Sequence, residues 1–293
     1  MLQRNHQHCA HTHSTRDRRD PTKTTVLRAK YERELVRRFK MIKSQIRKKI
    51  ITDNAFGMIT NAGDFDFPTR TAKVAAFNRW LDRMVKQGLL ERTEGVPMES
   101  AASKSWQNIY LRSAYQKGLA GAAGSMRSDG VEISDRWIDG GFYRPIHADA
   151  VGLIYIRAYS DLEGISKAMD TKISRTLAEG MAGGESMESI ADDIDQAVDG
   201  IGIVRARMLA RTEVIRAHAE ATLNTYEEAG IEGVEVMSEF ATAGDENVCP
   251  ECEDLEKKGE FTLEEARGVI PVHPNCRCAW LPVVINPEGI KLL

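Results

Sequence analysis

The chain has 293 residues, of which 42% are hydrophobic and 28% are charged, and its formal net charge is -3. This length accommodates one large or two ordinary domains with a sizeable core. No run approaches the ~18 apolar residues that span a bilayer, and the start of the chain has no apolar stretch. We therefore expect neither a membrane helix nor a secretory signal, and a protein that is made in the cytoplasm.

The charge is unevenly distributed along the chain. Residues 1–49 contain fifteen Lys and Arg against four Asp and Glu, a formal charge of +11, which leaves -14 for the remainder. A basic end of this kind is a plausible footprint for nucleic acid or for an acidic protein face. The plainer alternative is a solvated helix face that follows a flexible tail.

Residues 1–22 are predicted to be a disordered, basic tail, because they are polar and show no periodicity. The tail is also rich in histidine, and we expect no specific role for its histidines, His6, His8, His11 and His13.

Residues 23–145 are predicted to form a helical amino-terminal region. Apolar residues recur every three or four positions from Thr24 to about Ile51, and again from Val74 to Val85 with a stop near Gly88. A third helix is predicted around residues 106–113, weakened by the glycines between residues 118 and 124, and residues 129–145 are predicted to be a linker or a partly extended loop.

Residues 146–293 are predicted to be a second region. A long helix should end at Gly180, and Ser186 should cap a short helix that is broken at residues 199–202. A further helix should run from about Ile203 to Ala229, followed by short strands at residues 234–236, at Phe240 and at residues 280–284. The expected fold class is mainly α, a long-helix body with a small C-terminal α+β zinc-binding module at about residues 231–285.

Four of the five cysteines lie in the last forty-five residues, and a histidine stands beside the second pair. Two short turns that each present soft ligands are typical of a closed, tetrahedral metal site, so the sequence predicts one structural zinc ion. The alternative without zinc is a reduced or disulfide-bonded cluster, and disulfides are rare in a reducing compartment. The candidate ligands are Cys249, Cys252, His273, Cys276 and Cys278.

Five candidates compete for four positions, so one of them is surplus. Cys249 and Cys252 form a two-residue knuckle, and His273 with Cys276 repeats that gap. This spacing favours a site made of Cys249, Cys252, His273 and Cys276. The competing choice is an all-cysteine site in which Cys278 replaces His273. Four protein ligands leave no open position for water or substrate, so we expect no catalytic residues.

Three segments carry a resemblance to a known family. Residues 210–214 (Ala-Arg-Thr-Glu-Val), residues 242–252 and residues 273–278 resemble the bacteriophage Mu F-like minor head protein family, also called head morphogenesis. The similarity extends over roughly residues 148–284. One segment departs from the family, because residues 253–272 are highly charged, and helix-like at residues 262–267, where members more commonly have a short glycine turn followed by a strand.

The resemblance implies a structural virion component that is present in the phage head after assembly in the host cytoplasm. It implies association with the portal protein, a role in head morphogenesis and in DNA packaging or ejection, and no membrane contact. Scaffold or major capsid protein and DNA, the latter through the basic amino-terminal region, are further expected partners.

Two other classes of function compete with this one. His218 and Glu220 followed by Cys249 and Cys252 superficially match the signature of zinc deaminases, which would make the protein a deaminase-like or nuclease-like zinc enzyme on nucleic acid. Against it, Val248 stands where a proline is expected, and His218 falls inside a helix, where we expect an ordinary surface residue.

The other competitor is a zinc-ribbon nucleic-acid-binding protein, which would need a basic face. Residues 249–278 instead hold seven Asp and Glu against four Lys and Arg. We expect Arg211 and Glu213 to dock their helix onto the metal module, together with Asp245 and Arg277.

Overall fold

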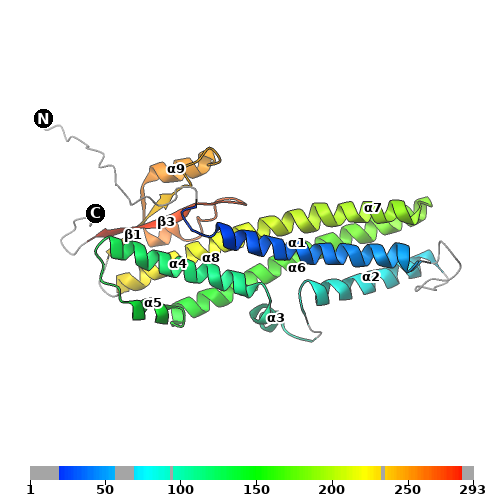
Figure 1. Ribbon diagram of the computed structural model, residues 1–293, viewed down its shortest axis with the longest axis horizontal. Coiled ribbons are helices and arrows are strands. Elements are labelled where there is room, and N and C mark those ends of the chain that lie inside the picture. The colour runs from blue at the N-terminus through cyan, green and yellow to red at the C-terminus, as the bar shows by residue number, and fades with distance from the viewer. Residues whose placement is uncertain (1–19, 57–68, 93–94, 232–234, 286–293) are drawn as a thin grey trace.

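The computed structural model describes residues 20–56, 69–92, 95–231 and 235–285. It is an elongated helical body with a small sheet and its helix α9 against one end (Figure 1). Within the described ranges, none of the helices combines the length and the apolar character of a membrane-spanning segment. The predicted tail, with its histidines, falls mainly on residues 1–19, outside the described residues. Its last residues are ordered, since the Asp20 carboxylate accepts hydrogen bonds from the Thr24 and Thr25 amides at the start of the first helix.

The first predicted helix is confirmed. Helix α1 (Thr25–Arg47) continues into a π-helical turn, η1 (Lys48–Thr52). Its apolar stripe is buried along its length, at Tyr31, Leu35, Phe39, Ile42, Ile46 and Ile50. The opposite face carries the basic residues and lies in solvent, as the helical period requires.

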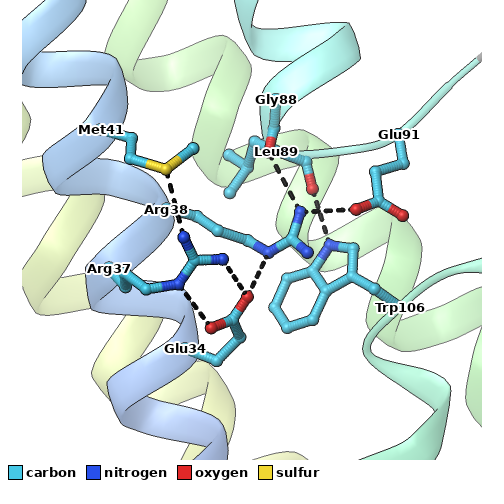
Figure 2. A network of polar contacts seen from close by, with 8 residues as sticks. All are labelled: Glu34, Arg37, Arg38, Met41, Gly88, Leu89, Glu91 and Trp106. Atoms are coloured by element: carbon cyan, nitrogen blue, oxygen red, sulfur yellow. Dashed lines mark hydrogen bonds and ion pairs between the residues drawn. The ribbon is translucent and has the colours of Figure 1, made fainter.

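Helix α2 (Arg70–Gly88) confirms the second prediction and packs beside α1. A polar network fixes its end against α1 (Figure 2). The Arg38 guanidinium donates to the Gly88 carbonyl at 3.1 Å and to Glu91 at 2.8 Å, while it lies 4.0 Å from the ring centroid of Trp106. Glu34, one turn earlier on α1, accepts from the Arg38 Nε at 2.8 Å.

The third helix is longer than predicted. A short helix, α3 (Met98–Lys104), precedes α4 (Asn108–Ser128), which runs straight through its glycines. Gly118 is where α4 meets helix α8: a Cβ placed there would lie 2.4 Å from the His218 carbonyl oxygen. This glycine therefore permits a close helix crossing and does not end the helix.

The loop predicted for residues 129–145 is wrong in its centre. Ser134 caps a short helix, α5 (Asp135–Gly141), by accepting a hydrogen bond from the Trp137 amide. Helix α6 (Pro145–Gly183) begins with proline in its first turn. It ends at Gly183, three residues beyond the predicted Gly180, because the next residue, Gly184, takes the left-handed conformation with φ 74°. Helix α6 runs through the whole length of the helical body (Figure 1).

The chain returns along α6 as one continuous helical path. Ser186 caps α7 (Met187–Ala197) as predicted, and a π-helical turn, η2 (Val198–Ile203), leads into α8 (Val204–Ile231). The predicted break at residues 199–202 is wrong. Gly202 faces the Phe39 ring of α1, where a Cβ would lie 2.5 Å from a ring carbon, so this glycine also serves a close contact.

A three-stranded antiparallel sheet follows α8. Its strands are β1 (Glu235–Ala241), β2 (Glu260–Phe261) and β3 (Ala279–Ile285), in the order β2-β1-β3 with Phe240 opposite Trp280. Two short helices lie between the strands, α9 (Pro250–Lys258) and α10 (Leu263–Ala266). The helix-like character predicted for residues 262–267 is confirmed, and Thr262 with Glu265 forms a capping box.

The buried residues fall into two clusters. One fills the space between α1, α2, α4, α6, α7 and α8. The other joins the sheet and its two short helices to α4 and α8, and it includes the buried cysteines of the predicted zinc module. The mainly α body with a small α+β module is confirmed, whereas the domain boundary between residues 145 and 146 stays a prediction.

Candidate metal centre

The cluster of cysteines begins at the start of helix α9. Cys249 is its N-cap residue, and its sulfur accepts a hydrogen bond from the Cys252 amide at 3.4 Å. Pro250 supplies a φ that suits the first helical position, and Cys252 lies one turn along. The sequence Cys-Pro-Glu-Cys therefore places two sulfurs at a helix N-terminus, where backbone N–H groups stabilise thiolates.

The other candidate ligands come from the loop before β3. The Cys276 amide donates to the His273 carbonyl at 3.1 Å, and Asn275 between them takes a left-handed conformation with φ 65°. This turn brings Cys276 to the same side as His273. Cys278 follows immediately before β3, and the side chain of the intervening Arg277 turns away to Asp245.

All five predicted ligands gather in one place. The His273 Nε2 lies 3.3 Å from the Cys249 sulfur and 3.4 Å from the Cys252 sulfur. The sulfurs of Cys252, Cys276 and Cys278 form a second triad whose members all lie within 4.8 Å of one another. Cys252 belongs to both triads.

The His273 ring is oriented for coordination. Its Nδ1 lies 2.9 Å from the Pro274 carbonyl oxygen, which can only accept a hydrogen bond, so Nδ1 carries the proton. The lone pair of Nε2 then points toward the sulfurs. This arrangement, with one ring nitrogen fixed by a carbonyl and the other free, is the usual one for a histidine that binds a metal ion.

Two cysteines favour the thiolate. The Cys252 amide lowers the pKa of Cys249, and a hydrogen bond from the Cys278 thiol lowers the pKa of Cys276 to about 5. The same hydrogen bond raises the pKa of Cys278, and burial raises the pKa of Cys252 to about 12. Protons are therefore shared between neighbouring sulfurs, and a divalent cation would replace these protons.

The space between the donors matches a single ion. A cavity of about 20 Å³ beside them is lined by Cys249, Cys252, His273 and Cys278, and also by Ala243, Asn247, Val248, Asn275 and Arg277. In a tetrahedral site with a metal–sulfur distance of ~2.3 Å and a metal–nitrogen distance of ~2.0 Å, nitrogen and sulfur lie ~3.5 Å apart. The observed 3.3 and 3.4 Å agree with this value, so His273, Cys249 and Cys252 are spaced as three ligands of one small cation would be.

Part of the predicted docking network is confirmed. Arg211 on α8 donates to the Asn275 side chain at 3.4 Å and to Glu32 of α1 at 3.0 Å, and the Asn275 amide donates to the Thr212 hydroxyl at 3.4 Å. The turn that carries His273 is thereby held against α8, and Arg211 also joins α8 to α1. The sequence offered no signal for Glu32, because Glu32 meets Arg211 only through the fold.

The other members of that network act elsewhere. Asp245 and Arg277 form a two-pronged ion pair at 2.6 Å, which joins the loop after β1 to the cysteine loop inside the module. The docking role predicted for Glu213 is wrong. Glu213 is buried, pairs with Arg157 of α6 at 3.2 Å and with Arg216 at 2.7 Å, and burial raises its pKa.

His218 is also placed differently from the prediction. It is buried and not a surface residue, since only 7% of it is exposed, and burial lowers its pKa to about 4. Among the described residues, His218 belongs to neither triad of possible metal ligands. The deaminase interpretation therefore lacks its histidine ligand.

A further anchor of the module was missed in the sequence. Arg267, directly after α10, donates to the Asn224 amide oxygen at 3.0 Å and pairs with Glu227, both on α8. Asn224 in turn donates to the Tyr115 hydroxyl of α4 at 2.9 Å. The module is thus attached to α8 both near Thr212 and near Asn224.

Comparison with known proteins gives one match. Residues 171–281, less than half of the chain, match the model of the family described as Phage Mu protein F like protein. The matched range includes the Arg211 helix and all five candidate ligands, and it begins later than the residue 148 expected from the sequence. No curated protein and no solved structure gives a significant match. Over residues 171–281, this chain is therefore similar to the Mu F-like phage proteins.

Proposed function

We propose that the protein is a minor component of the phage head that associates with the portal vertex and acts in head morphogenesis and in DNA packaging or ejection. The observation that carries the proposal is the family match, because it spans both the α8 segment and the module that α8 holds. The basic region of residues 1–49 supports DNA as a partner, and scaffold or major capsid protein remains a further partner in the proposal.

The role proposed for the metal centre is structural. The sheet has three strands, one of them only two residues long, so it builds little core of its own. One zinc ion would hold α9 to the loop before β3 and so fix the module in its folded form. Soft thiolate and imidazole donors are those that zinc prefers.

Two ligand sets compete for the ion. Cys276 lies within 4.8 Å of Cys252 and Cys278 in the second triad, and its pKa is lowered to about 5. We propose Cys249, Cys252, His273 and Cys276 as the ligands, the set that the spacing favours. The substitution Cys276→Ser should then lower the zinc content, and Cys278→Ser should leave about one zinc per chain. The opposite pattern would favour a set that includes Cys278.

The portal assignment is tested by co-expression. The chain should co-purify with a tagged portal protein from the same phage at low and at moderate salt. The matched control is a chain that ends after residue 170, which lacks the matched range and should not co-purify. Failure of the full chain to co-purify at every salt concentration would contradict the assignment, whatever the zinc content of the protein.

A further inference from the structure

A groove lies on the solvent side of α1, beside the start of α8. It encloses about 570 Å³ and is lined by Arg33, Val36, Arg37, Lys40 and Met41 of α1 and by Arg207 of α8, with Glu32 and Ser44 at its margin. We call it the α1 groove. It lies on the face of α1 opposite the buried stripe, so the packing of the helical body leaves it open.

The floor of the α1 groove is apolar. Met41 is 44% exposed, and Val36, five residues earlier on the same helix, is half-buried. Arg37 is held across this floor, since it donates to Glu34 at 2.6 and 2.7 Å and to the Met41 sulfur at 3.2 Å (Figure 2). An exposed thioether beside fixed guanidinium groups offers a contact for an apolar side chain.

The rim of the α1 groove is cationic. Four of its residues are positive and one, Glu32, is negative, and Glu32 is already paired with Arg207 at 3.3 Å. Within the described parts of the chain, Arg33 and Lys40 have no ion pair or hydrogen bond through their side chains. These two charges are available to carboxylates of a partner.

We propose that the α1 groove docks an acidic amphipathic helix of a partner protein. One apolar side chain of that helix would enter over Val36 and Met41, while carboxylates on the neighbouring turns would meet Arg33 and Lys40. A nucleic-acid backbone fits less well, because it has no group for the apolar floor and would face the Glu32 carboxylate. The proposal goes beyond the portal assignment and does not depend on it.

The test uses the full chain and a fluorescein-labelled peptide of about four helical turns, with leucine every three or four positions and glutamate elsewhere. We expect a Kd on the order of 10–100 µM by fluorescence anisotropy. Three controls probe the chemistry: the same peptide with lysine for glutamate, one with serine for leucine, and a duplex DNA of similar length.

Matched variants localise the binding. Arg33→Glu combined with Lys40→Glu should raise the Kd of the peptide at least about tenfold. Lys104→Glu combined with Lys167→Glu changes the net charge equally at exposed positions on other helices, and it should have less than about a twofold effect. Met41→Ser keeps the charge and should weaken binding through loss of the apolar contact alone.

Each outcome decides the proposal. The proposal is supported if peptide binding weakens in the Arg33→Glu, Lys40→Glu double variant and in Met41→Ser but not in the control double variant. Circular dichroism must show unchanged helix content in each variant. No peptide binding at ~1 mM would overturn it. Equal weakening by the two double variants would also overturn it, since net charge alone would then explain the binding. The proposal would likewise be overturned if the serine peptide bound as tightly as the leucine peptide, or if DNA bound more tightly than it. The groove would then be a general polyanion surface.

Discussion

The close crossing of α4 and α8 can be tested with a single methyl group. In Gly118→Ala the new Cβ would lie 2.4 Å from the His218 carbonyl oxygen and 2.8 Å from the Ala221 Cβ. A carbon and a carbonyl oxygen normally approach no closer than ~3.3 Å, so α8 must move by roughly 1 Å. Both neighbours belong to a helix backbone or a Cβ, and no flexible side chain can move aside.

The magnitude follows from two opposing effects. Inserting a methyl group into a tight contact costs about 1–3 kcal/mol, and the rigid neighbours place Gly118→Ala toward the upper value. Replacing glycine by alanine inside a helix stabilises by about 1 kcal/mol. We expect Gly118→Ala to lower the free energy of unfolding by about 2 kcal/mol.

The same helix supplies the matched control. Gly121 is exposed on α4, and a Cβ there would meet no atom within 4 Å. Gly121→Ala should therefore raise the free energy of unfolding by about 1 kcal/mol. The helix-propensity gain is common to both variants, so the difference between them, about 3 kcal/mol, is the steric cost alone.

Urea unfolding followed by circular dichroism measures both variants with one probe. The reasoning is refuted if Gly118→Ala and Gly121→Ala change the unfolding midpoint in the same direction and by similar amounts. Such a result would mean that α4 and α8 do not meet at Gly118.

Three further predictions concern the metal centre, its attachment and a buried acid. Cys252→Ser removes the donor shared by both triads and should abolish zinc binding and expose the module to protease, whereas Cys9→Ser should leave about one zinc per chain by metal analysis. Arg211→Ala removes the contacts to Glu32 and Asn275 and should lower the free energy of unfolding, measured in urea, by about 1–2 kcal/mol. The zinc content should stay unchanged, and loss of zinc in this variant would contradict the prediction. Burial raises the pKa of Asp170 to about 7. Between about pH 4 and pH 7 the carboxyl is therefore protonated in the folded chain and ionised in the unfolded chain. The free energy of unfolding should fall as the pH rises through this range. Asp170→Asn should therefore stabilise by at most about 4 kcal/mol at pH 8 and by little at pH 4, and an equal effect at both pH values would contradict the sign.

The elements that sequence reasoning found are those whose signal is local. The apolar stripe of α1 has a helical period and one buried face, so its bounds and its core residues could both be predicted. The gathering of the five candidate donors could be predicted for a similar reason, because the two-residue gaps at each end place the members of each pair close together. The helix-like segment at Thr262 could be predicted from its local sequence, and the structure adds a capping box.

The errors arise where a residue's role depends on a distant neighbour. Gly118 and Gly202 looked like helix breakers, but they serve contacts with α8 and with Phe39, which lie about 100 or more positions away in the sequence. Ile109 belonged to the predicted apolar pattern of the third helix and is 67% exposed. Glu213 was assigned to the metal module because its actual partner, Arg157, cannot be identified before α6 and α8 are placed side by side.

Helix α6 has a mechanical consequence. Its 39 residues, at a rise of ~1.5 Å each, make a rod of roughly 58 Å. Its first turns lie at the end of the molecule that carries the sheet, and its last turns lie beside α2 and α7 at the other end (Figure 1). Two partners bound at opposite ends of α6 would therefore be held at a fixed distance and orientation relative to each other.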